Sequence, residues 1–151
     1  MKFQQKATIP VGREPLWDFL MDVPKVAKSL PGVESVNKID DTTYEGVLKV
    51  RVGPIGLNLA GKIFLEERDK DNWKAALRAE AADRMAAGAV RGKTSMQLKE
   101  LGPSETELLV ETDVSILGKI GEFGQPIIRK KADQMLNEFV ENIKKQLAAK
   151  S

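Results

Sequence analysis

The sequence predicts an α+β fold in which seven antiparallel strands pack one face of their sheet on a long C-terminal helix, with two short helices after the first strand. Segments that alternate apolar and polar side chains follow one another at hairpin-length connections, which favours antiparallel pairing. Residues 123–149 instead repeat apolar side chains every three or four positions, as one long amphipathic helix does. This apolar stripe consists of Ile128, Ala132, Met135, Leu136, Phe139, Ile143 and Leu147.

Both ends of the last segment carry helix signals. Pro126 suits a first helical turn, where its missing N–H costs nothing, and Lys144 and Lys145 lie near the end that the helix dipole makes negative. A helix of about 25 residues from Gln125 would be roughly 37 Å long. We therefore expect it to span the sheet and cover its apolar face.

The N-terminal region predicts one strand and two short helices. Residues 2–9 alternate and end at Pro10, so they predict the first strand. A short helix opens at Glu14-Pro15, and a second covers residues 24–29 and stops before Pro31-Gly32.

The remaining alternating segments predict six more strands. The segment after Trp73 is rich in alanine, so residues 74–86 would also suit a helix by propensity alone. The predicted strands are residues 33–39, 43–52, 57–66, 73–81, 86–98 and 105–117.

Composition narrows the functional classes. The chain of 151 residues has no linker, repeat or low-complexity tract, so we expect one domain over residues 1–151. Its 24 lysines and arginines are interspersed with 22 acidic residues, a distribution that argues against nucleic-acid binding. Cysteine and histidine are absent, so we expect neither a metal site nor a cofactor, and the usual catalytic residues are scarce. Without an apolar segment of spanning length, we expect a cytoplasmic protein.

Glycine stands at four positions of the predicted apolar sheet face, Gly46, Gly61, Gly88 and Gly92. They indicate either bulges and bends that let the sheet curl or missing volume beneath the helix. The second reading implies a hollow that binds a hydrophobic molecule. Its walls would be Leu48, Leu59, Ile63, Val90, Met96, Ile128 and Met135.

Several motifs along the whole chain resemble those of the carbon monoxide dehydrogenase G-subunit (CoxG) family. The specific blocks are Leu30-Pro31-Gly32 and Phe123-Gly124-Gln125-Pro126. The supporting motifs are Trp17-Asp18-Phe19-Leu20, Val26, Tyr44-Glu45-Gly46, Val52-Gly53-Pro54-Ile55 and Leu117-Gly118-Lys119-Ile120. The resemblance implies a START-like (SRPBCC, polyketide cyclase-like) helix-grip fold, in which a curved seven-stranded sheet grips the long helix over a cavity.

The resemblance also implies a non-catalytic accessory protein of an aerobic carbon monoxide dehydrogenase-type molybdenum hydroxylase, associated with recruitment of the enzyme to the cytoplasmic membrane. Some members carry a hydrophobic tail that this sequence lacks, so we expect any membrane contact to be peripheral. A cavity of this kind suits a quinone, another isoprenoid or a lipid. The candidate ligand-binding residues are Trp17, Leu30, Tyr44, Leu48, Leu59, Ile63, Leu77, Met85, Val90, Met96, Phe123, Ile127, Ile128 and Met135.

Two other functions remain open at this stage. An interaction module with a filled core would bind a protein partner and no ligand. A cyclase- or dehydratase-like enzyme would need an inward acid, and Tyr44 with Arg84 is the one credible pair. Lys119, Arg129, Lys130 and Lys131 form a basic group near the start of the long helix, which is either a solvated helix face or a contact for anionic lipids.

Overall fold

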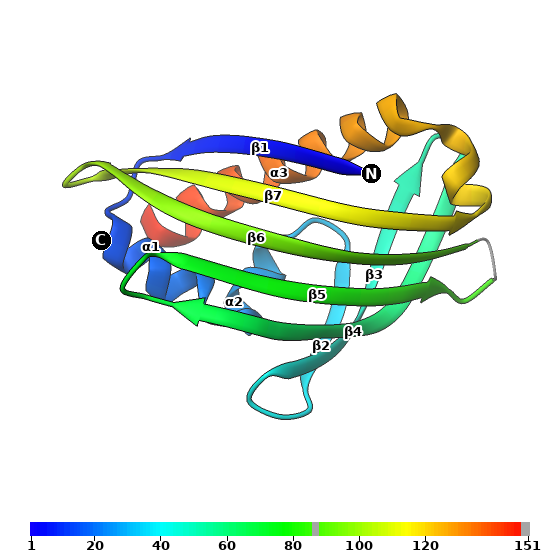
Figure 1. Cartoon of the computed structure of the whole chain (residues 1–151), viewed down its shortest axis with the longest axis horizontal. Coiled ribbons are helices and arrows are strands. Elements are labelled where there is room, and N and C mark those ends of the chain that lie inside the picture. Colours follow the sequence, from blue (N-terminus) through cyan, green and yellow to red (C-terminus); the bar gives the residue numbers. More distant parts are fainter. Residues whose placement is uncertain (86–87, 149–151) are drawn as a thin grey trace.

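The computed structural model describes residues 1–85 and 88–148, and its strands form one antiparallel sheet in the order β1-β7-β6-β5-β4-β3-β2. The sheet curves around helix α3, and the two short helices lie on the same side of it (Figure 1). The elements are β1 (Lys2–Ile9), α1 (Arg13–Leu20), α2 (Val23–Ser29), β2 (Val33–Lys38), β3 (Thr43–Val52), β4 (Ile55–Asp69), β5 (Lys74–Asp83), β6 (Gly88–Gly102), β7 (Glu105–Gly118), the 3-10 helix η1 (Lys119–Phe123) and α3 (Gln125–Ala148). The predicted fold class and order of elements are confirmed.

The alanine-rich segment is strand β5, as predicted, although its composition also suits a helix. It lies between β4 and β6 and is paired along its length with both neighbours. Two hydrogen-bonded ladders outweigh a propensity difference that amounts to tenths of a kcal/mol per residue. Strand β6 is longer than predicted and reaches Gly102; the prediction that it begins at Ala86 lies outside the described residues.

The long helix begins later than the apolar pattern suggested. Phe123 ends the short helix η1, and α3 starts at Gln125 after Gly124, whose φ is +78°. Gly118 before η1 has a φ of +82°. Both conformations are costly for residues with a Cβ, so the two glycines break the chain into a strand, a short helix and a long helix.

The hydrophobic core consists of two clusters. The larger joins α1, the sheet and α3, and its buried members are Ile9, Leu16, Trp17, Phe19, Leu98, Leu108, Phe139, Val140 and Ile143. The smaller lies where η1 meets β3 and β4, and its buried members are Val52, Leu57, Leu59 and Ile120. Polar contacts fix α2 to α3, because Asn142 and Gln146 donate to the backbone oxygen and the hydroxyl of buried Ser29 over 2.9 and 2.7 Å.

The four glycines of the concave face serve the curvature of the sheet. A Cβ on Gly61 would overlap the backbone oxygen of Glu80, and one on Gly46 would lie 2.5 Å from the backbone oxygen of Ser35. None of the four glycines lines the cavity described below. The missing-volume interpretation of these positions is therefore wrong, because neighbouring backbone occupies the space that their side chains would need.

Candidate ligand-binding cavity

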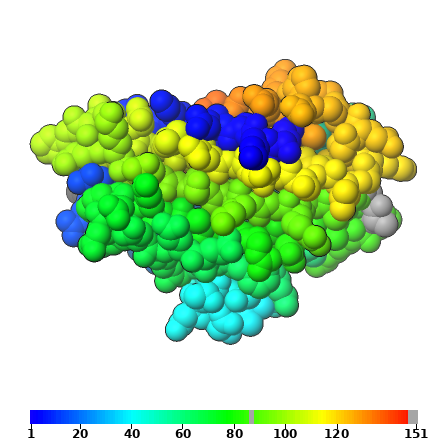
Figure 2. Space-filling view, viewed as in Figure 1, coloured from blue at the N-terminus to red at the C-terminus, as the bar shows by residue number. Residues whose placement is uncertain are grey.

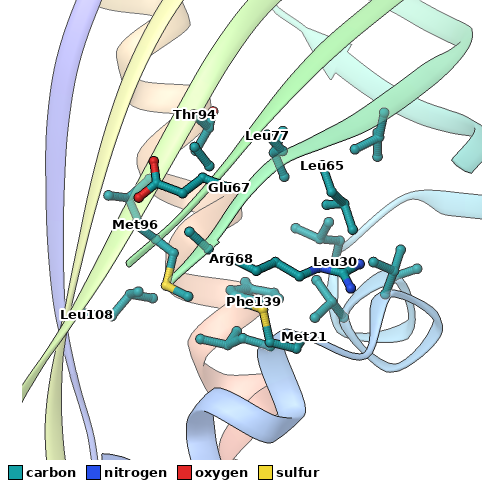
Figure 3. Close-up of a pocket in the computed structure, with 18 of the residues that line it drawn as sticks. Met21, Leu30, Leu65, Glu67, Arg68, Leu77, Thr94, Met96, Leu108 and Phe139 are labelled. Carbon is teal, nitrogen blue, oxygen red and sulfur yellow. The ribbon is translucent and has the colours of Figure 1, made fainter. Parts of the chain in front are cut away.

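A cavity of about 240 Å³ lies between helix α2 and the concave face of the sheet. Helix α2 contributes one apolar wall with Val26, Ala27 and Leu30, and the strands supply the opposite wall. Leu108 and Phe139 are buried at its inner side, whereas Glu67 and Arg68 are its only exposed lining residues and mark the opening. Figure 3 shows the labelled side chains of the two walls around this common space.

Small and adaptable side chains leave the space open. Ala75 and Ala76 stand on β5, where a larger residue would fill the cavity, and Met21 and Met96 contribute flexible thioethers. Thr94 is the one lining hydroxyl, and it lies 3.3 Å from the hydroxyl of Thr112, with which it shares a hydrogen bond. The inner walls are therefore apolar, with their single hydroxyl already partnered.

A β-bulge in β4 brings a charged residue to this apolar cavity. Leu65 pairs with Leu77, but the register then shifts and Arg68 pairs with Ala75. Positions three apart in a regular strand face opposite sides of a sheet, whereas Leu65 and Arg68 both line the cavity. The extra residue, Glu66, thus reverses the alternation and places Arg68 on the concave side.

Arg68 holds the opening through one recorded hydrogen bond. Its guanidinium donates to the backbone oxygen of Asp41 over 3.2 Å, in the hairpin between β2 and β3. This hairpin projects from the body of the molecule (Figure 2). The Glu67 carboxylate and the Arg68 guanidinium point in opposite directions in Figure 3, and no ion pair of Arg68 occurs among the described residues.

The structure brings part of the predicted site together. Leu30, Ile63, Leu77 and Met96 line the cavity, from α2, β4, β5 and β6. The remaining candidates lie elsewhere. Among the inward-facing ones, Leu48, Leu59, Val90 and Phe123 pack in or against the smaller core cluster, and Trp17 belongs to the larger one.

The other predicted residues also lie outside the cavity lining. Tyr44 is buried on β3, and Met135 faces a shallow depression beside Pro31 and Lys49. Ile128 is half-buried in the first turns of α3, where Ile127 is 43% exposed, and Met85 is 85% exposed. The missed lining residues are chiefly those of α2 and the end of α1, whose apolar spacing was visible in the sequence without indicating that the face borders a cavity.

The suggested acid pair is separated in the structure. Tyr44 pairs with Ile63, whereas Arg84 follows Asp83, which pairs with Leu59. Four residues along β4 correspond to about 13 Å. In the part of the chain that the structure describes, no cluster of carboxylates could hold a metal ion, and no helix is both long and apolar enough to cross a bilayer.

The basic group near the start of α3 does not form a cavity. Arg129 donates to the backbone oxygen of Lys2 over 3.1 Å and so ties α3 to β1. Lys130 is exposed, and Lys119 lies in η1. The arrangement is that of a solvated helix face with one structural arginine.

Three solved structures share this architecture. A conserved protein from Geobacillus kaustophilus superposes with a TM-score of 0.90 at 18% identity, covering 99% of this chain and 96% of that one. The Zhui aromatase/cyclase from Streptomyces sp. R1128 gives 0.69 at 14% identity, covering 97% and 92%, and a START superfamily protein from Mycobacterium smegmatis gives 0.70 at 12%, covering 99% of each chain. The fold therefore defines a START-like helix-grip protein.

The sequence places the protein more narrowly within that class. Residues 6–148 match the family model of the carbon monoxide dehydrogenase G-subunit (CoxG), and the chain belongs to this family. No curated protein sequence matches the chain.

Proposed function

We propose that the protein is a non-catalytic carrier of a hydrophobic small molecule, which it holds in the cavity between α2 and the sheet. The observation that carries the proposal is an unfilled space of about 240 Å³ with apolar inner walls. An engineered apolar cavity of about 150 Å³ binds benzene, so this one has room for a ring with a short chain. Burying about 300 Å² of such a ligand contributes roughly 7 kcal/mol before association costs.

The family supports a more specific role. Members of the CoxG family carry the name of a redox enzyme, carbon monoxide dehydrogenase, and such an enzyme has to pass its electrons to an acceptor. We propose that the ligand is a quinone, another isoprenoid or a lipid. On this proposal the protein assists a carbon monoxide dehydrogenase-type molybdenum hydroxylase, either by delivering the acceptor or by recruiting the enzyme to the membrane.

Mass spectrometry of the natively purified protein tests the carrier proposal. We expect one added lipophilic mass per chain, released by extraction with organic solvent. A protein that carries no such mass and does not bind the neutral hydrophobic dye Nile red would contradict it and favour an interaction module.

A pair of variants on one strand locates the site. Ala75 lines the cavity and faces Met96 across the β5–β6 ladder, whereas Ala82 is exposed on the same strand and does not line it. Ala75→Leu should weaken Nile red binding at least tenfold because the added carbons occupy the ligand space. Ala82→Leu adds the same volume outside the cavity and should leave binding unchanged. Equal effects of both variants would place the dye elsewhere.

Co-purification tests the partner. Immobilised protein should retain the molybdenum hydroxylase from an extract of the source cells, and purified enzyme should then bind directly. An enzyme that reduces its acceptor equally well with and without this protein would remove the delivery role, while the binding of a ligand would stand.

A further inference from the structure

One side chain sets the polarity of the cavity opening, and this inference rests on the proposed carrier function. Arg68 and Glu67 are the exposed lining residues, and only Arg68 lies on the concave side by the register of β4 and β5. Its partner Ala75 pairs onward with Met96, which also lines the cavity. The guanidinium therefore stands between an apolar interior and solvent.

The guanidinium has hydrogen-bonding capacity to spare. It carries five N–H donors, and a single hydrogen bond, to the backbone oxygen of Asp41, is recorded for it. The nearby Asp41 carboxylate is already paired with Lys38 over 3.1 Å. Other surface arginines of the described chain do have carboxylate partners, as Arg78 has in Glu80 at 2.9 Å. Arg68 is thus a cation whose remaining donors are available to a ligand.

The interior offers no competing site for a polar group. Thr94 shares its hydrogen bond with Thr112, and the other inner lining residues are apolar. A head group carried inward would lose its hydrogen bonds to water without replacement, at a cost of several kcal/mol for a charged group. A hydrocarbon part gains from the same environment.

We propose that Arg68 is the head-group residue of this carrier: the ligand enters tail first and presents an oxygen acceptor, as in a carboxylate or a ketone, to the guanidinium at the opening. A charged oxygen gains more than a neutral one, because charge-assisted hydrogen bonds are about twice as strong. The fork of the guanidinium also favours a head with two oxygens side by side. Arg68 acts here as a specificity-determining residue.

Competition with Nile red tests the proposal with three probes of similar size, namely decanoate, 2-decanone and butylbenzene. Arg68→Gln should weaken decanoate about tenfold and 2-decanone about threefold, and it should leave butylbenzene unchanged. Arg78→Gln is the matched control, since Arg78 lies on neighbouring β5, stacks on Phe64 and does not line the cavity. It should change none of the three affinities.

The outcomes separate this proposal from the carrier function. If Arg68→Gln leaves decanoate and 2-decanone unchanged, or weakens butylbenzene as much as decanoate, the head-group role is wrong while the cavity still binds ligand. If no probe binds the wild-type protein, the carrier function itself fails. Retained butylbenzene binding shows that the variant is folded, and Arg68→Lys should keep part of the decanoate affinity because it keeps the charge.

Discussion

Gly61 provides the sharpest test of how this sheet is built. It lies in the middle of β4, between β3 and β5, and a Cβ there would lie 2.6 Å from the Cα of Ala81 and overlap the oxygen of Glu80. These neighbours are backbone atoms, so they can move only if the two strands separate. We expect Gly61→Ala to destabilise the protein although it adds only one carbon.

The magnitude follows from two opposing terms. Overpacking against fixed neighbours costs about 3 kcal/mol at the upper end of the usual range. Alanine restricts the unfolded chain more than glycine does, which offsets at most about 1 kcal/mol. The net loss is about 2 kcal/mol, or roughly 4–8 °C in melting temperature for a protein of this size.

Gly56 on the same strand is the matched control. The nearest atom to a Cβ at Gly56 is the terminal guanidinium nitrogen of Arg51 at 3.7 Å, an ordinary contact with a flexible side chain. Gly56→Ala should therefore change the free energy of unfolding by less than about 0.5 kcal/mol. Urea unfolding followed by circular dichroism measures both variants. Free energies of unfolding for the two that agree within about 0.5 kcal/mol would refute the steric explanation.

Three further predictions concern the closing helices and the protruding hairpin. Ser29→Ala removes the hydroxyl that accepts from Gln146, and it should cost about 1–3 kcal/mol in urea unfolding; a neutral effect would show that the contact does not fix α2. Phe139→Ala should cost about 3–5 kcal/mol, because its buried ring packs beside the cavity, and a loss below about 1 kcal/mol would contradict that packing. The backbone N–H of Thr42 lowers the pKa of the Asp40 carboxyl below its ordinary 3.8, so its contribution to stability is present above about pH 4 and is lost as the pH falls through the lowered pKa. NMR titration should give a pKa below 3.8, and a value at or above it would disprove the hydrogen bond.

The fold was readable because its signals are local and repeated. Alternation along residues 105–117 and the apolar stripe of the last helix each extend over many positions, and both elements form as expected. The errors fall where one residue decides. Gly124 delays the long helix to Gln125 through its positive φ, a conformation that the apolar spacing around it does not reveal.

The cavity was only partly readable. Leu30, Ile63, Leu77 and Met96 were predicted and line it, since alternation and the end of a short helix identify inward side chains. Inward orientation alone does not distinguish a cavity wall from packed core, and Leu59 shows the difference: it faces inward and is buried in the smaller cluster.

The sequence by itself determined the order of the strands and helices, the apolar character of the concave face and the family to which the chain belongs. Only the tertiary structure decided where the unfilled space lies, because that depends on how far α2 stands from the sheet opposite Ala75 and Ala76. It also decided that Arg68 reaches this space, since the bulge that reverses the strand's alternation is a property of two paired strands. Periodicity records which face a residue takes, whereas the distance between packed elements depends on every side chain between them.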